Sequence, residues 1–289
     1  MAKVVGFLAV DIMKKILVYH LYCGKDFSEN MANKVHFMCL SKYIKVFDEI
    51  RFTISVDDLS DRDTIADGLQ WILSLNHNGV KNIRIVKNTE LYEVETFKTE
   101  ILKGYENLDG YVFFAHNKGT MNMKNPQVNG EAIFRWVCGM YFYNFEFLNE
   151  VEGYFNGNLR ASEVFYGTFL TQFPKYRTNV CHAMPNNISG LEYSGTFYWI
   201  NMPKYKNCRM VGTVKDVEPD SRYFAEEYPG MWFERYAYGC GMTSHNDAIL
   251  DATNLNLYYA DDKKWDEVLA ILGEADRFKE FLNEIRKKI

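Results

Sequence analysis

Three polar residues, His116, Asn117 and Lys118, directly follow a short apolar run at 111–115. The run is rich in aromatic and β-favouring residues and follows a turn pair, as expected of a buried strand. An imidazole, an amide and an ammonium group would then stand at the carboxyl end of a strand, where open α/β sheets bind their ligands. The glycine that follows would let the backbone approach a ligand closely, and Lys118 would meet a phosphate as a point charge.

Polar side chains also follow three earlier runs with the composition of strands, at 16–19, 51–56 and 82–86. These side chains belong to His20, Asp57, Asp58 and Asn88. Helical spacing of apolar residues separates the runs at 29–46 and 62–76. Alternating strands and helices predict a mostly parallel sheet with helices on both faces. We therefore expect one edge of the sheet to gather all of these polar groups.

Two of the predicted helices carry specific expectations. In the helix at 62–76 the inward side chains are Ile65, Leu69, Ile72 and Leu73. Gly79 is expected to stop this helix, because glycine tolerates the left-handed cap conformation. The segment 131–151 is aromatic on nearly all sides, which predicts one mostly buried helix.

Length, charge and cysteine usage narrow the class of protein. The 289 residues carry a net charge of −5, which argues against a general nucleic-acid-binding protein. Six scattered cysteines without a CxxC pair favour reduced, mostly buried thiols over disulfides or a zinc site. No stretch reaches the roughly 18 apolar residues of a membrane span, so we expect a soluble, cytoplasmic protein. One domain over 1–289 is the simplest organisation.

The acidic pair Asp57-Asp58 has two interpretations. Aspartate is a good N-cap, so the pair could simply begin a turn and a helix. Alternatively, the two carboxylates contact the base or ribose of a nucleotide. The acidic run 57–63 also suggests a calcium loop, but it lacks the glycine and the terminal glutamate of that pattern.

Four motifs, taken in order, resemble a family of bacterial glycosyltransferase-like proteins encoded with capsular and surface-polysaccharide biosynthesis genes. In that family a strand ends in His-x-Lys-Gly, an aromatic helix with a Trp follows, and then come a Ser-Gly-Asn-Phe-Trp-Trp-like segment and a late Arg…Glu pair. The matching residues are His116-Asn117-Lys118-Gly119, Arg135-Trp136, Ser194-Gly195-Thr196-Phe197-Tyr198-Trp199, and Arg222 with Glu226 or Glu227. The similarity spans residues 14–235. Thr196 stands where the family pattern has Asn, and Tyr198 where it has Trp.

The resemblance implies a GT-A-like fold and a hexosyltransferase-type activity that uses a nucleotide-sugar donor such as a UDP- or GDP-sugar. It divides residues 14–235 into a nucleotide-sugar-binding half at 14–120 and an acceptor and catalytic half at 121–235. Apolar residues at helical spacing predict a helical C-terminal extension at 236–289. The implied donor-binding residues are His20, Asp57, Asp58, Asn88, His116, Asn117 and Lys118. The implied acceptor-binding residues are Ser194, Gly195, Trp199 and Arg222.

The resemblance also assigns catalytic roles. Glu226, or else Glu227, would take the proton of the acceptor hydroxyl, and His116 would act beside it. Trp199 would serve as a platform for a sugar ring, although packing in a core is nearly as good an explanation. In GT-A folds a strand-end Asp-x-Asp usually holds a divalent metal, and here His116-Asn117-Lys118 takes its place. We therefore favour positive side chains over a metal for neutralising the departing diphosphate.

Two other functions stay open. One is a non-catalytic binding protein of the same fold that takes part in polysaccharide assembly. The other is a metal-dependent hydrolase that uses Asp57, Asp58 and His20. For the transferase, the acceptor would be a surface glycan or lipid-linked glycan. The basic residues 286–288 would then favour anionic lipid and a place at the inner face of the membrane.

Overall fold

The computed structural model describes residues 13–117, 130–156, 164–167, 170–172, 191–193, 195–207, 219 and 222–235. Its elements in chain order are β1 (Lys15–Cys23), α1 (Met31–Tyr43), η1 (Ile44–Val46), β2 (Glu49–Val56), α2 (Arg62–Leu73), β3 (Val80–Lys87), α3 (Glu93–Thr96), η2 (Phe97–Lys103), η3 (Tyr105–Asn107), β4 (Tyr111–His116), α4 (Gly130–Phe145), α5 (Leu148–Asn156), β5 (Phe165–Gly167), β6 (Leu170–Gln172), β7 (Leu191–Tyr193), β8 (Tyr198–Asn201), α6 (Met202–Asn207) and α8 (Phe224–Arg235).

Within the described residues, six strands form one mixed, mostly parallel sheet in the order β3-β2-β1-β4-β8-β5. The first four strands of the chain pair in parallel, as the sequence predicts. Strand β8 is antiparallel to both β4 and β5, which makes the sheet mixed. Strands β6 and β7 form a separate antiparallel pair. The main sheet thus joins strands from both predicted halves of the chain.

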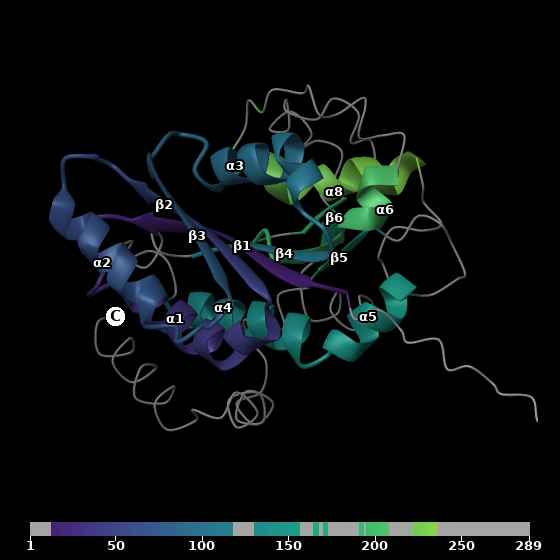
Figure 1. The fold of residues 1–289 in the computed structure, drawn as a ribbon, viewed down its shortest axis with the longest axis horizontal. Coiled ribbons are helices and arrows are strands. Elements are labelled where there is room, and N and C mark those ends of the chain that lie inside the picture. The colour runs from purple at the N-terminus through teal and green to yellow at the C-terminus, as the bar shows by residue number, and fades with distance from the viewer. Residues whose placement is uncertain are drawn as a thin grey trace, which may run out of the picture.

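Helices cover both faces of the sheet (Figure 1). Helices α1, α2, α4 and α5 lie on one side, and α3, α6 and α8 lie on the other. Two hydrophobic cores lie on the two faces of the sheet, and successive side chains of a strand belong alternately to one and the other. In β1, Leu17 and Tyr19 belong to the first core, and Ile16 and Val18 belong to the second. Burial on both faces explains why these strands read as nearly continuous apolar runs.

The predicted helix at 62–76 and the aromatic segment 131–151 differ in detail from expectation. Helix α2 ends at Leu73, whose side chain is 57% exposed and not inward. The left-handed residue after α2 is Asn76, with φ 50°, and not Gly79. The aromatic segment forms two helices, α4 and α5. Its predicted burial is confirmed for α4, in which Phe134 and Tyr141 have no exposed surface.

One prediction about β1 is wrong. The strand does not end before His20 but continues in register with β2 as far as Cys23. The reason is that Leu21 and Cys23 are apolar and belong to the core under α1 and α2, so alternation carries the strand on. His20 is consequently an interior strand residue, three positions short of the strand end.

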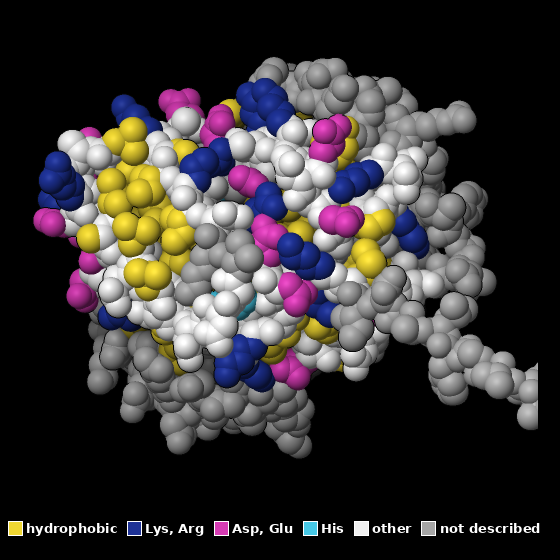
Figure 2. Space-filling view, viewed as in Figure 1, with side chains coloured by type: hydrophobic (Ala, Val, Ile, Leu, Met, Phe, Trp, Pro, Cys, Tyr) yellow, Lys and Arg dark blue, Asp and Glu magenta, His cyan; other side chains and the backbone are white. Residues whose placement is uncertain are grey.

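Some large hydrophobic side chains are exposed at the surface. Figure 2 shows hydrophobic side chains gathered on the side where α2 and β3 lie. Leu73 of α2 and Ile85 of β3 are large hydrophobic residues with exposed side chains. Cys23, Cys39 and Cys138 are buried free thiols, as predicted for them. The other three cysteines lie outside the described residues, as does the predicted extension at 236–289. None of the helices in the described part of the chain has the length and apolar character needed to cross a bilayer.

We predict that Gly110→Ala lowers the free energy of unfolding by about 1–3 kcal/mol, the cost of one strained backbone residue. Gly110 has φ 130°, and a Cβ there would collide with the carbonyl oxygen of Lys14, which accepts the first hydrogen bond between β1 and β4. The matched control is Gly153→Ala in α5, where an added Cβ meets nothing within 4 Å. This control should gain about 0.5–1 kcal/mol. Urea denaturation checks both, and equal stabilities would contradict the analysis.

Candidate functional site

A row of polar side chains crosses the sheet near its carboxyl edge. In the strand register, Arg84 of β3 lies opposite Thr53 of β2, which lies opposite His20 of β1, which lies opposite His116 of β4. Residues in register on neighbouring strands share one face of the sheet. This is the face covered by α3 and α8, since the neighbouring Val18 and Phe114 belong to the core on that side. The polar groups that the sequence predicts at the edge of the sheet thus continue inward as this row of polar side chains.

Helix α3 contacts both histidines of this row. The Thr96 hydroxyl lies 2.9 Å from His20 Nδ1, and Glu93 Oε1 lies 3.7 Å from His116 Nε2. Glu93 and Thr96 are three residues apart, so they occupy the same face of the helix. Both are buried. The stretch 92–96 fits the family resemblance, but the sequence assigned no role to Glu93 or Thr96, and the signal for them was their helical spacing.

The backbone around α3 has two rare features. Tyr92, which precedes the helix, has φ 48° and ψ −124°, a conformation that is uncommon for a bulky residue. The helix then continues as a π-helix over Phe97–Lys103. Strained residues and π-helical turns occur frequently at functional sites.

The backbone of Gly195 is held between two ionisable side chains. Its N–H donates to Glu226 Oε1 at 3.1 Å, and its carbonyl oxygen accepts from His116 Nε2 at 3.1 Å. Because a carbonyl only accepts, Nε2 must carry a hydrogen, which leaves Nδ1 as the basic nitrogen of a neutral His116. Glu226 is 4% exposed and stands in the first turn of α8, where the helix dipole favours a carboxylate.

Only glycine fits at position 195. Its φ is 98°, and a Cβ would lie 3.1 Å from a ring carbon of Trp136 and still closer to the sulfur of Met140. The next residue, Thr196, has φ 59° and is fully buried. A β-branched residue in the left-handed region is strained. Asparagine, which the family pattern has at this position, adopts that conformation more readily.

The predicted donor residues Asp57 and Asn88 lie together beyond the ends of β2 and β3. Asp57 accepts hydrogen bonds from the Tyr22 hydroxyl at 2.8 Å and from Asn88 Nδ2 at 3.1 Å. Ser55 donates to Asn88 Oδ1 at 3.2 Å. Burial, reinforced by the bond to Asp57, raises the pKa of Tyr22 above its ordinary value. The sequence analysis missed Tyr22, although it lies two residues after His20 on the same strand face.

Asn117 joins the ends of β1 and β4. Its Oδ1 accepts from the Tyr22 backbone N–H, and its Nδ2 donates to the Tyr22 carbonyl, both at 2.8 Å. The same Nδ2 lies 2.8 Å from Asn33 Oδ1 in α1. This side chain therefore extends the strand pairing by one residue, which is a structural use of a predicted donor residue.

Asp58 is exposed and bonds locally. Its Oδ1 accepts from the backbone N–H of Ser60, and this bond lowers the pKa of the carboxyl group. The N-cap of α2 is Asp61, which accepts from the Thr64 backbone N–H, so neither member of the predicted pair caps the helix.

The remaining predicted residues lie in different surroundings. Trp199 has no exposed surface, because its ring packs against Phe47, Phe113 and Phe145 in the core. Its indole face is therefore not available to a sugar in this structure. Arg222 is exposed, with its guanidinium 4.7 Å from the ring centre of Tyr223. Glu227 is buried beside Glu226. Lys118 and Ser194 lie outside the described residues.

His20 is a neutral buried histidine. Burial, together with the nearby His116 and Arg84, lowers its pKa from 6.5 to about 3. Its Nε2 is buried without a hydrogen-bond partner. Groups of three or more metal-ligating side chains placed to hold an ion are not found among the described residues.

Comparison with models of known protein families gives no match for this chain, and comparison with curated protein sequences gives none either. The resemblance to capsular-polysaccharide glycosyltransferases therefore stays a prediction from the sequence.

We predict that His20 makes the stability of the fold fall as pH drops below about 6.5. Its folded pKa lies below its unfolded value, so protons bind preferentially to the unfolded chain between about pH 6.5 and 3. The free energy of unfolding should lose up to about 1.4 kcal/mol per pH unit from this group. Denaturation at pH 6.5 and 5 checks this, with His20→Gln as the control that should have a shallower pH dependence. Identical slopes would mean that His20 is not held neutral.

Proposed function

We propose that this chain is a GT-A-type glycosyltransferase that transfers a sugar from a nucleotide-sugar donor to a surface glycan. The observation that carries the proposal is the buried carboxylate of Glu226, which accepts from the N–H of Gly195, the residue whose carbonyl oxygen contacts His116. Buried carboxylates are rare unless they are paired, and a buried carboxyl group close to a histidine at the carboxyl edge of an α/β sheet is a candidate active site.

The donor site lies at the carboxyl edge between β1 and β4. Chain connections leave β1 toward β2 on one side and enter β4 on the other, and ligands bind in the crevice at such a switch point. Beyond the neighbouring ends of β2 and β3, Asp57 and Asn88 offer a carboxylate and an amide, and Tyr22 of β1 offers the hydroxyl that bonds Asp57. These groups suit the polar atoms of a base or ribose. Asp58 is an exposed neighbour of this group.

The transfer proceeds by direct displacement. The acceptor hydroxyl oxygen forms a bond to the anomeric carbon of the sugar, and the bond from that carbon to the diphosphate oxygen breaks. The electron pair of the broken bond stays on the nucleoside diphosphate, and the hydroxyl proton passes to the Glu226 carboxylate. Inversion at the anomeric carbon follows from this single displacement.

Four side chains and the backbone of Gly195 support this step. The Gly195 N–H bonds Glu226, His116 bonds the Gly195 carbonyl, and Glu93 approaches the same His116 nitrogen. Lys118 follows Asn117 directly in the sequence, and we assign it to the charge of the leaving diphosphate. Arg222 stands two residues before α8 on the surface, where it can reach an acceptor glycan.

The alternative is a binding protein that recognises the same nucleotide or glycan without turnover. The specific observation in its favour is the 4% exposure of Glu226, which must reach an acceptor hydroxyl if it is to act as a base. Donor hydrolysis separates the two functions.

We predict slow release of nucleotide from one member of a panel of UDP-, GDP-, CMP- and dTDP-sugars. Many transferases pass the sugar to water when the acceptor is absent, so the product reports the donor site alone. The assay is run with manganese and with EDTA, and persistence in EDTA supports the cationic clamp. If no nucleotide is released from any donor, and no nucleotide changes the melting temperature of the protein, the chain neither binds nor uses these donors. That result would contradict the proposal.

We predict that Glu226→Gln lowers the rate of nucleotide release by about 10²–10⁴-fold, the usual contribution of a general base. The amide oxygen of Gln still accepts from the Gly195 N–H, so folding and nucleotide affinity should be retained. Glu106→Gln, at an exposed glutamate of η3, is the control and should keep the wild-type rate. A Glu226→Gln rate within a few-fold of wild type, at unchanged melting temperature, would remove Glu226 from the mechanism.

A further inference from the structure

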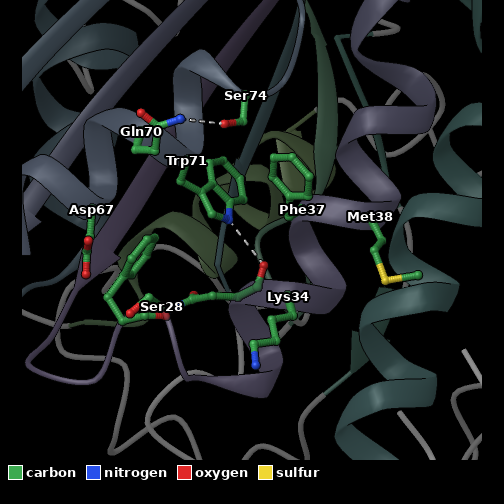
Figure 3. A pocket seen from close by; sticks show the side chains of 10 residues that line it. Ser28, Lys34, Phe37, Met38, Asp67, Gln70, Trp71 and Ser74 are labelled. Carbon is green, nitrogen blue, oxygen red and sulfur yellow. Dashed lines mark hydrogen bonds between the residues drawn. The ribbon is translucent and has the colours of Figure 1, made fainter. Parts of the chain in front are cut away.

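A pocket of about 370 Å³ lies between α1 and α2, on the opposite face of the sheet from the polar row (Figure 3). Its apolar walls come mainly from Phe27, Phe37 and Trp71. Figure 3 shows the Trp71 indole in the centre of the view, with Phe37 beside it and Asp67 and Gln70 on its other side. A volume of this size accommodates a small-molecule ligand.

The central aromatic side chain is fixed in place. Trp71 Nε1 donates to the backbone carbonyl of Asn33 at 3.3 Å. The Trp71 ring centre lies 5.5 Å from that of Phe37 and 6.5 Å from that of Phe27, both in edge-to-face geometry. Trp71 is only partly buried, so part of this rigid indole is open to the pocket.

The polar side chains that line the pocket carry no net charge. Gln70 Nε2 donates to Ser74 Oγ at 3.1 Å across one turn of α2. Lys34 and Asp67 contribute one charge of each sign. A strongly anionic ligand such as a phosphate gains nothing from a neutral lining of this kind. A neutral ligand with an apolar face and several hydroxyl groups satisfies both the aromatic wall and the hydrogen-bonding side chains.

We propose that this pocket binds one pyranose unit of a neutral glycan, stacked on Trp71 and hydrogen-bonded by Asp67 and Gln70. The identity of the glycan rests on the proposed function, in which a growing acceptor chain must stay attached to the protein. The pocket is a binding subsite and takes no part in bond formation.

Asn33 connects the pocket to the carboxyl edge of the sheet. Its backbone carbonyl accepts from Trp71, while its side chain bonds the Phe27 carbonyl at 2.9 Å and Asn117 Nδ2 at 2.8 Å. Asn117 in turn ends the pairing of β1 and β4 beside His116. A glycan in the pocket would therefore lie next to Asn33, which is hydrogen-bonded to Asn117 at the ends of β1 and β4.

The test measures glycan binding without any nucleotide. Wild-type protein is titrated with glucose, galactose, mannose, N-acetylglucosamine, maltohexaose and N-acetylchitohexaose, and binding is followed by saturation-transfer NMR and tryptophan emission. At least one neutral sugar should bind, whereas inorganic phosphate should not compete with it. Trp71→Phe and Gln70→Ala should each weaken that binding about tenfold or more, equivalent to about 1.4 kcal/mol.

Asp63→Ala is the matched control, because Asp63 is an exposed carboxylate on the same helix outside the pocket. It should bind like wild type, and Gln70→Ala, at an exposed residue, guards against a variant that fails to fold. No sugar binding across the panel, or equal binding by wild type and both pocket variants, overturns the proposal. Glycan binding without donor hydrolysis would keep the pocket and reject the transferase, and the reverse result would do the opposite.

Discussion

One buried residue, Gly195, connects the central sheet to helix α8 through its backbone. It bonds His116 at the end of β4 with its carbonyl and Glu226 at the start of α8 with its N–H. Burying a carboxylate or an imidazole is costly unless its polar atoms are hydrogen-bonded, and Gly195 supplies one hydrogen bond to each. The tight turn that places these two backbone groups requires glycine at 195.

Two residues that lie close in sequence to the contacts of this site have a strained backbone. Thr196 and Tyr92 both have positive φ values, and they precede β8 and α3 respectively. Each costs about 1–3 kcal/mol, which the surrounding core must offset. Thr196 directly follows Gly195, whose carbonyl contacts His116. Tyr92 directly precedes α3, whose side chains contact His20 and His116.

Much of the fold could be predicted from the sequence. The sequence also names His20, His116, Gly195 and Glu226 as candidate site residues, but it does not give their contacts with one another or with Glu93 and Thr96. The parallel strands β1–β4 and the helices between them follow from periodicity, because each element buries its own apolar face. The polar carboxyl edge follows from the parallel direction of those strands. The contacts of Glu93 and Glu226 depend on how α3 and α8 pack on the sheet, which no local pattern encodes. Trp199 was ambiguous for the same reason, since stacking on a sugar and packing in a core demand the same residue.

The most direct test of the account is where a nucleoside diphosphate binds. Backbone amide spectra of the isotopically labelled protein are recorded by NMR with and without UDP and GDP. The account predicts shifts for the amides of Tyr22, Asp57, Asn88 and Gly195, which lie along the carboxyl edge of the sheet from β3 to β4. Shifts confined to the opposite edge of the sheet, or no shifts at saturating nucleotide, would contradict it.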